Sequence, residues 1–390
     1  MPYLPIHIDF APGEEYQARY RFWQGCPTLV RTPRGRLFAG WYSGGITEPS
    51  EKNYNLLVRS DDDGWTWSRP ELVVPSEPQN GFLAIDIQLW LDPLERMWLF
   101  IVQRYIGGDR RQTDADHLAT WATICDNPDA DTLQWSQPRF ISQGFLRTKP
   151  TVLSNGDWVM CAYDWSSPNF RYSRSGDEGK TWVRCEAGRK LGAGFDETMI
   201  LERLDHSLLM YARVHKPYIV KCTSPDLKGA TWSDGEYTQI LNADSRFFLQ
   251  RLKSGRVLLI NNESDTHRTN LRAKLSEDDG ETWKYSIHLD DAANRAQNVS
   301  YPDAAQAGDG RIFVIYDCGR KTFKEIRMAQ FTEEDIMAGT LTDHDSYFRR
   351  IICKAPGKPY DEKYFEKENL HQDDWFKNVF MRLARPQDAK

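Results

Sequence analysis

The chain has 390 residues, of which 40% are hydrophobic and 13% aromatic, and its formal net charge is −6 at pH 7. This acidic balance argues against a nucleic-acid partner, which needs a basic surface, and no apolar run approaches the roughly 18 residues that cross a membrane. Seven scattered cysteines without a CxxC pair predict reduced thiols rather than a disulfide framework or a zinc site.

Six segments along the chain share one pattern: a short β-rich run, a turn and a second β-rich run. They cover residues 27–42, 87–102, 150–165, 198–213, 247–262 and 302–317. Each segment predicts a β-hairpin. Six hairpins, each completed by an outer pair of strands, predict an all-β fold, namely a six-bladed β-propeller of four-stranded blades.

A second repeat, Ser-x-Asp-x-Gly-x-Thr-Trp, follows several of these hairpins. Intact copies lie at 60–67, 175–182 and 276–283, a copy with one inserted residue lies at 224–232, and a worn copy lies at 126–135. The Asp and Ser can bond their own turn, the Gly adopts a conformation closed to other residues, and the Trp packs between blades. These are the Asp-boxes typical of sialidase-like propellers, and we expect their acids to be structural rather than catalytic.

The composition changes after the last hairpin. Thr332 to Asp335 predict a capped helix start. Beyond residue 358 the chain is charged, and its apolar residues recur at helical spacing at Trp375, Phe376, Val379, Phe380 and Leu383. We therefore expect a propeller over 1–357 and a short helical tail over 358–390, which packs on the propeller edge or forms a homodimer contact.

The innermost strand of each blade starts beside the central axis, so the residue before it is aimed at one shared pocket. These six positions hold Cys26, Asp86, Lys149, Glu197, Arg246 and Tyr301. Clusters of mutually perturbing ionisable groups in a concavity indicate an active site. The alternative is a salt-bridged plug that fills the mouth of the channel.

At these positions the chain resembles the sialidases, from about Phe22 to Phe331. Sialidases carry a Glu that opens one blade, an Arg that closes the same hairpin, an Arg before a later Asp-box, a nucleophilic Tyr that opens the last blade, and a pocket Asp. The residues that match these are, in the same order, Glu197, Arg213, Arg268, Tyr301 and Asp86.

The resemblance implies a mechanism that the residue types support. Glu197 would remove the proton of Tyr301, whose phenolate attacks the anomeric carbon of a sugar bearing a carboxylate. Arg213 and Arg268, with Arg246 as a further candidate, would hold that carboxylate through forked, charge-assisted hydrogen bonds.

Two features depart from the sialidase pattern. Sialidases begin the first blade with Arg-Ile-Pro, whereas this stretch here reads Gly25-Cys26-Pro27. Either Arg246 or Lys149 replaces the missing arginine from another blade, or the substrate is not sialic acid. The sialidase general acid is an Asp on the loop after the first hairpin, where this chain offers Glu48 or Glu51.

The leading hypothesis is an exo-acting glycoside hydrolase that releases a terminal acidic sugar from a glycan. Two alternatives stay open: a lyase or hydrolase acting on uronate- or rhamnose-containing glycans, and a non-catalytic glycan-binding propeller. Because the chain has no P-loop, GxSxG, dinucleotide-binding or HExxH pattern, we expect neither a cofactor nor a metal. No leader region is visible at the N-terminus, so we expect a cytoplasmic protein, or a secreted one if a leader has been removed.

Overall fold

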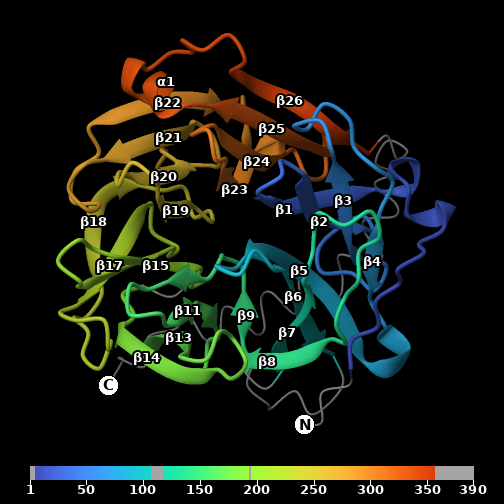
Figure 1. The fold of residues 1–390 in the computed structure, drawn as a ribbon, viewed down its shortest axis with the longest axis horizontal. Coiled ribbons are helices and arrows are strands. Elements are labelled where there is room, and N and C mark those ends of the chain that lie inside the picture. The colour runs from blue at the N-terminus through green and yellow to red at the C-terminus, as the bar shows by residue number, and fades with distance from the viewer. Residues whose placement is uncertain (1–4, 107–116, 193–194, 356–390) are drawn as a thin grey trace.

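The computed structural model describes residues 5–106, 117–192 and 195–355, and the helical tail predicted for 358–390 lies outside them. Six four-stranded antiparallel sheets are arranged around a central axis (Figure 1). Their strands follow one another in chain order from the axis outwards, with one short strand skipped in the third sheet. The predicted six-bladed β-propeller of four-stranded blades is confirmed.

The first three blades are built from residues 23–189. Their strands are β1 (Trp23–Arg31), β2 (Leu37–Gly44), β3 (Tyr54–Ser60) and β4 (Leu72–Pro75); β5 (Phe82–Leu91), β6 (Met97–Tyr105), β7 (Leu118–Cys125) and β8 (Arg139–Gln143); and β10 (Thr151–Val152), β11 (Trp158–Met160), β13 (Asn169–Ser175) and β14 (Val183–Arg189). Beside the third blade, β9 (Phe145–Leu146) pairs with β12 (Ala162–Tyr163).

The last three blades complete the ring. Their strands are β15 (Thr198–Glu202), β16 (Leu208–Ala212), β17 (Tyr218–Ser224) and β18 (Glu236–Leu241); β19 (Phe248–Arg251), β20 (Val257–Asn262), β21 (Leu271–Ser276) and β22 (Tyr285–Asp290); and β23 (Val299–Gln306), β24 (Ile312–Cys318), β25 (Glu325–Phe331) and β26 (Tyr347–Lys354). Short 3-10 turns lie at Glu14–Tyr16, Ala18–Tyr20, Pro78–Asn80 and Arg295–Gln297.

One α-helix, α1 (Glu333–Ala338), follows β25 in the described part of the chain. Its start is the capping box that the sequence predicted: the Thr332 hydroxyl accepts from the Asp335 amide, and the Asp335 carboxylate accepts from the Thr332 amide. No helix among the described residues is long and apolar enough to span a bilayer.

The hydrophobic core lies between neighbouring blades, so each sheet buries both faces. The side chain of Trp67, from the first Asp-box, packs on a cluster that joins Leu37 of the first blade to Ile315 and Met328 of the last. Full burial of one large apolar side chain contributes about 1.5–3 kcal/mol. This packing between blades explains the high aromatic content of the chain.

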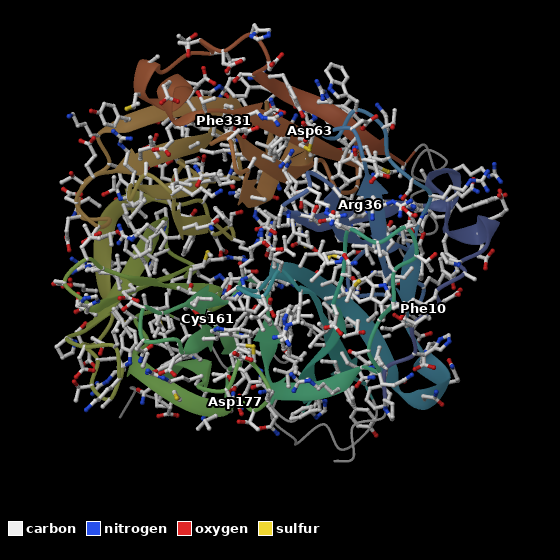
Figure 2. The ribbon with its side chains drawn as sticks, in the orientation of Figure 1. Phe10, Arg36, Asp63, Cys161, Asp177 and Phe331 are labelled. Carbon is white, nitrogen blue, oxygen red and sulfur yellow. The ribbon has the colours of Figure 1, made fainter. Side chains whose placement is uncertain are left out.

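The Asp-box turns have the local bonding that their residue types predict. In the first, the Asp62 carboxylate accepts from the Thr66 amide at 2.8 Å and from the Thr66 hydroxyl at 2.6 Å. The Ser60 hydroxyl accepts from the amide of Gly64, whose φ of 84° is in the left-handed region. The same bonds recur around Asp177 and Asp278. Figure 2 shows Asp63 and Asp177 of two such turns away from the centre of the ring.

The ring closes where the first blade meets the last, and Asp303 of β23 fixes this contact. Its buried carboxylate accepts from the Thr28 hydroxyl at 2.6 Å, from the Leu29 amide at 3.0 Å and from the Gln88 side chain at 3.0 Å. Asp303 therefore ties the innermost strands of blades 6, 1 and 2 together, so the pocket at the axis has a fixed frame.

Candidate active site

Three innermost strands carry a two-residue β-bulge at corresponding positions, Cys26–Pro27, Ile85–Asp86 and Tyr301–Pro302. The strands begin earlier than the sequence predicted, so Cys26, Asp86 and Tyr301 lie inside them and not before them. A bulge bends a strand and redirects its side chains, and Tyr301 has a φ of 57°, which is uncommon for a residue other than glycine. The bulges hold these residues in place at one end of the axis.

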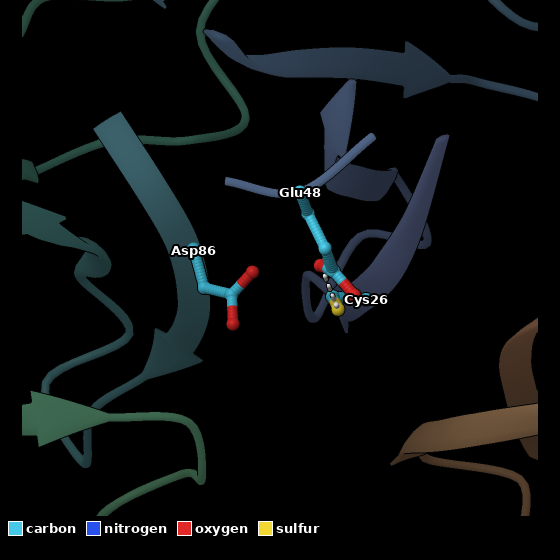
Figure 3. A group of neighbouring side chains, drawn as sticks. All are labelled: Cys26, Glu48 and Asp86. Atoms are coloured by element: carbon cyan, nitrogen blue, oxygen red, sulfur yellow. Dashed lines mark hydrogen bonds between the residues drawn. The ribbon is translucent and has the colours of Figure 1, made fainter. Parts of the chain in front are cut away.

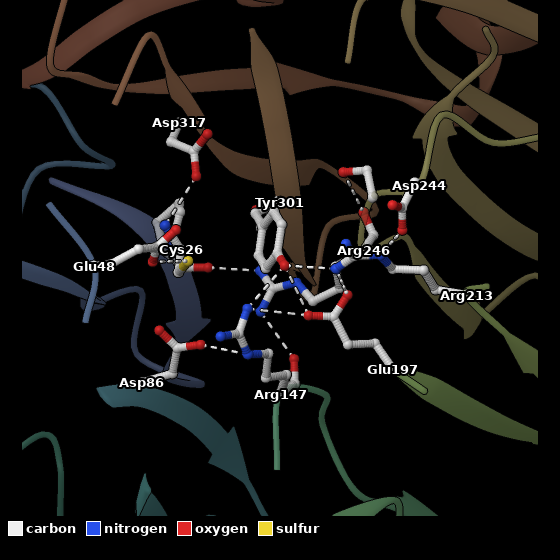
Figure 4. Close-up of polar contacts among 12 residues, drawn as sticks. Cys26, Glu48, Asp86, Arg147, Glu197, Arg213, Asp244, Arg246, Tyr301 and Asp317 are labelled. Carbon is white, nitrogen blue, oxygen red and sulfur yellow. Dashed lines mark hydrogen bonds and ion pairs between the residues drawn. The ribbon is translucent and has the colours of Figure 1, made fainter. Parts of the chain in front are cut away.

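Tyr301 and Glu197 meet at the centre of this group, although they come from blades 6 and 4 (Figure 4). The Tyr301 hydroxyl donates to Glu197 Oε1 at 2.8 Å. It also accepts from Arg147 Nη1 at 2.8 Å and from Arg213 Nη1 at 2.7 Å. Both side chains are buried, with 2% of Tyr301 and 1% of Glu197 exposed. The phenol oxygen is thus bonded to one carboxylate and two guanidinium groups.

The charges around this pair set its protonation state. Burial alone would raise the pKa of Glu197, but Arg213 and Arg147 outweigh it and lower that pKa to about 2. Burial raises the pKa of Tyr301, with the same two arginines opposing the shift. At neutral pH the resting pair is therefore a phenol that donates to an ionised carboxylate, with two cations in position to stabilise a phenolate.

Arg147, on the segment between β9 and β10, connects this pair to Asp86. Its Nη1 lies 3.1 Å from Glu197 Oε1, and its Nε lies 2.6 Å from Asp86 Oδ2. Burial raises the pKa of Asp86 to about 6, because the attraction of Arg147 only partly offsets the loss of solvent. Asp86 therefore exchanges its proton closer to neutral pH than an ordinary aspartate does.

Arg213 follows β16 and is held from several sides. Its Nη1 lies 2.6 Å from Glu197 Oε2, and its Nε lies 2.8 Å from Asp244 Oδ1. The other oxygen of Asp244 contacts His215 Nδ1 at 2.9 Å. Burial would raise the pKa of Asp244, but Arg213 and His215 outweigh it and lower that pKa. These contacts orient Arg213 towards the Tyr301 hydroxyl.

Arg268, on the loop between β20 and β21, makes no ion pair with a carboxylate in the described part of the chain. Its Nε and Nη2 donate to the backbone carbonyl of Asp244 at 3.3 and 3.1 Å. Burial lowers its pKa, as do the nearby cations Arg213 and Arg320, while Tyr301 opposes the shift. An anion bound beside Arg268 would relieve this crowding of positive charge.

Arg246 lies beneath the Tyr301 ring, with its guanidinium 5.0 Å from the ring centroid. Its Nη1 donates to the Arg147 carbonyl at 2.8 Å, and its Nη2 donates to the carbonyls of Pro27 and Tyr301 at 2.8 and 3.0 Å. These bonds favour a role in holding the central strands together. The substrate-binding role that we predicted for Arg246 stays a prediction.

Lys149 lies deeper along the axis. Its ammonium group donates to the backbone carbonyls of Leu29 and Ala304 and pairs with Asp303 at 3.2 Å. Burial lowers its pKa, and Asp303 opposes the shift. Like Arg246, Lys149 contacts backbone of the central strands, and its predicted substrate-binding role also stays a prediction.

Glu48, on the loop after the first hairpin, reaches the same pocket. Its Oε1 accepts from Arg320 Nη1 at 2.7 Å, and the Cys26 thiol lies 3.8 Å from its Oε2. Ligand-type atoms of Cys26, Glu48 and Asp86 lie within 4.8 Å of one another (Figure 3). Because Arg320 and Arg147 already pair with the two carboxylates, we assign no metal to this group.

Two functional candidates were missed by sequence reasoning, namely Arg147 and Arg320. Arg147 stands two residues before Lys149, which the sequence placed at the pocket. Residues i and i+2 of an extended segment share a face, so this spacing could have identified Arg147 as a second pocket residue. Arg320 follows the exit of β24 by two residues, and no pattern marked it. Five guanidinium groups lie within 6 Å of the Tyr301 ring centroid, namely those of Arg147, Arg213, Arg246, Arg268 and Arg320.

The other end of the axis holds a cavity of about 810 Å³. Its lining includes Trp90, Met199 and Phe248 from the innermost strands and Leu204 and His206 from a turn on the Asp-box side. Tyr301 and Glu197 do not line it. The cluster of ionisable groups and this mostly apolar cavity are therefore separate features of the central channel.

The comparisons with known proteins agree with this architecture. A family model for the BNR repeat-like domain matches residues 88–314. The chain is 28% identical to an anhydrosialidase of Macrobdella decora over 195 residues, and 25% identical to a sialidase of Micromonospora viridifaciens over 345 residues. These matches cover 45% and 79% of this chain but only 25% and 51% of the relatives. The chain thus spans about half or less of the length of these curated relatives.

A solved structure gives the same fold. The intramolecular trans-sialidase of Ruminococcus gnavus, in complex with oseltamivir carboxylate, has a TM-score of 0.65 and 16% sequence identity to this chain. The superposition covers 83% of this chain and 97% of that one. At this identity the likeness establishes the sialidase-like propeller fold alone.

Proposed function

Because this chain belongs to the BNR repeat-like domain family, and its distant relatives include sialidases, we propose that it is a glycoside hydrolase that releases a terminal acidic sugar from a glycan. The observation that carries the proposal is the Tyr301 hydroxyl, which lies 2.8 Å from an ionised Glu197 and within hydrogen-bond distance of Arg147 and Arg213. A phenol with an unperturbed pKa near 10 needs such neighbours to act as a nucleophile at neutral pH.

In the first step the Tyr301 oxygen attacks the anomeric carbon while its proton passes to Glu197. Since Glu197 is a weak base with a pKa of about 2, the transfer is completed only as the new carbon–oxygen bond forms. Arg147 and Arg213 stabilise the negative charge that develops on the phenol oxygen. A neutral phenol also suits a substrate whose own carboxylate would repel a carboxylate nucleophile.

The leaving oxygen needs a proton, and two acids reach the pocket. Asp86 has a pKa raised to about 6, which gives it a protonated fraction near neutral pH. Glu48 comes from the loop that carries the general acid in sialidases, and it pairs with Arg320. The raised pKa favours Asp86 as the donor. In the second step, the ionised Asp86 takes a proton from a water molecule whose oxygen attacks the anomeric carbon. The carbon–oxygen bond to Tyr301 breaks, and Glu197 returns its proton to the phenol oxygen.

For the substrate we propose a glycan that ends in a carboxylate-bearing sugar. The support is the group of arginines around Tyr301, among which Arg268 has no carboxylate partner in the described residues. The R. gnavus relative was solved with a ligand that is itself a carboxylate. A cation that lacks an acid partner beside a candidate nucleophile is a fitting site for an anionic substrate group.

The proposal is tested by product analysis with sialyl, ketodeoxy-sugar and uronyl glycosides. We expect release of the terminal acidic sugar from one class, and loss of that release in Tyr301→Phe. A product that absorbs as an unsaturated uronate would indicate a lyase instead. Glycan binding without turnover would indicate a non-catalytic propeller. Either of these outcomes would contradict the hydrolase.

A further inference from the structure

Gly25 stands in β1 at the place of the arginine in the Arg-Ile-Pro stretch of sialidases. A Cβ atom on this residue would lie 2.7 Å from Arg320 Cδ and 2.8 Å from its Cγ and Nε. Such contacts are too close for real atoms. The Arg320 side chain therefore occupies the space that a side chain of residue 25 would fill. The absence of a side chain at Gly25 is what admits Arg320.

Two acids then hold the Arg320 guanidinium at the pocket. Its Nε donates to Asp317 Oδ2 at 2.9 Å, and its Nη1 donates to Glu48 Oε1 at 2.7 Å. The same Asp317 oxygen accepts from the Cys26 amide at 2.8 Å, so the guanidinium is fixed to the first blade as well as to its own. It lies 4.2 Å from the Tyr301 ring centroid.

One donor of this guanidinium is still available. Arg320 Nη2 is buried and has no hydrogen-bond partner among the described residues. A buried donor without a partner carries a desolvation cost, which a bound acceptor removes. Arg268 lies near enough to Arg320 for the two cations to repel each other, and a carboxylate placed between them would satisfy both. Arg213, by contrast, is committed to Glu197, Asp244 and the phenol oxygen.

From this geometry we infer that Arg320 of the last blade supplies the substrate-binding cation that the first blade lacks, and that Arg320 and Arg268 together bind the substrate carboxylate. The inference rests on the proposed function. It deepens that function, because it explains how an acidic sugar is recognised by a chain with Gly25-Cys26-Pro27 in its first blade. The competing interpretation is that Arg320 only neutralises Glu48 and Asp317.

A pair of probes separates these interpretations. We would measure the binding of 2,3-didehydro-2-deoxy-N-acetylneuraminic acid and of its methyl ester by calorimetry, for the wild type and for Arg320→Ala and Arg320→Lys. We expect both variants to bind the free acid about 10- to 100-fold more weakly, the loss typical of one charge-assisted pair, and the ester almost as the wild type does. The exposed Arg295→Ala, before the same blade, is the control and should change neither affinity.

Relocation of the arginine is the sharper test. Gly25 has no positive φ, so Gly25→Arg combined with Arg320→Ala keeps an allowed backbone while returning the cation to the first blade. We expect this double variant to recover affinity for the free acid, and Gly25→Ala alone to weaken it by displacing Arg320. Equal losses for acid and ester in a folded Arg320 variant, or no recovery on relocation, would overturn the inference. A wild type that neither binds nor cleaves acidic sugars would overturn the proposed function itself.

Discussion

The two faces of the propeller use acidic residues in opposite ways. In the Asp-box turns, the partners of each aspartate lie within four residues of it, and these local bonds lower the pKa of Asp177 to about 2. At the pocket, Glu197 and Asp86 also have partners from distant parts of the chain, namely Tyr301 of blade 6 for Glu197 and Arg147 for both, and burial raises the pKa of Asp86 to about 6. An acid bonded to its own turn stabilises that turn. Acids of the pocket are instead surrounded by charged groups from distant parts of the chain, which shift their pKa values and suit them to proton transfer.

The largest effect is expected at the pocket. Tyr301→Phe removes one buried oxygen and should lower turnover of the acidic glycoside by about 10³-fold or more, with the fold preserved. Glu197→Gln should be comparably damaging. Because the two groups act as a unit, the double variant should be little worse than either single one. Steady-state kinetics with circular dichroism as the fold control checks this, and fully multiplicative losses would contradict a coupled pair.

A smaller loss is expected when only the geometry of a cation changes. Arg268→Lys keeps the charge but removes the planar guanidinium group, which can donate two parallel hydrogen bonds to a carboxylate. KM for the free acid should therefore rise about 10-fold or more, with a smaller change in kcat. Arg272→Lys is the matched control, since Arg272 is on the adjacent strand of the same blade and pairs with Glu263 instead. An unchanged KM in Arg268→Lys would argue against a carboxylate clamp.

The two kinds of acid should also differ in how they link stability to pH. Asp86 has a raised pKa, so the folded state holds its proton longer than the unfolded state does, and the contribution of Asp86 to the free energy of unfolding falls as pH rises from about 4 to about 6. Asp177 has a depressed pKa, so its contribution is present above about pH 4 and is lost as pH falls towards 2.

Thermal unfolding across this pH range measures the difference. Relative to the wild type, the Tm of Asp86→Asn should rise between pH 4 and 6 and then stay level. The relative Tm of Asp177→Asn should instead fall between pH 2 and 4 and stay level above that. If the relative Tm of both variants changed in the same direction with pH, the proposed difference between the two faces would be wrong.

The smallest effect on activity is expected at an Asp-box. Asp177→Ala removes bonds to Ser175 and Thr181 and should lower the Tm by a few degrees. Turnover per folded molecule should stay within about twofold, since the Asp177 side chain bonds to residues of its own turn and to none of the pocket residues. If a stably folded Asp177→Ala variant lost its activity, the Asp-box would have a catalytic role, which would contradict its assignment as a structural turn.

The blades were predictable because their signals are local. A hairpin pattern and the Asp-box each lie within a few consecutive residues, and both fix turn geometry directly. The contact between Tyr301 and Glu197 was expected because both residues lie at or near the axial starts of innermost strands, Tyr301 as the third residue of β23 and Glu197 just before β15. Arg147 and Arg320 were missed because their positions depend on non-local geometry. Arg147 reaches a phenol 154 residues away, and Arg320 depends on a gap left by Gly25 across the ring closure.

If Tyr301 is the nucleophile of a glycosidase, the enzyme forms a covalent intermediate on its phenol oxygen, and this intermediate can be trapped. A fluorinated acidic sugar with a good leaving group forms the glycosyl-enzyme but slows its hydrolysis, so the adduct accumulates. Digestion and mass spectrometry should find the sugar on Tyr301, and Glu197→Gln should form the adduct more slowly. An adduct on Asp86, Glu48 or Glu197, or turnover of the natural glycoside by Tyr301→Phe at the wild-type rate, would contradict the account.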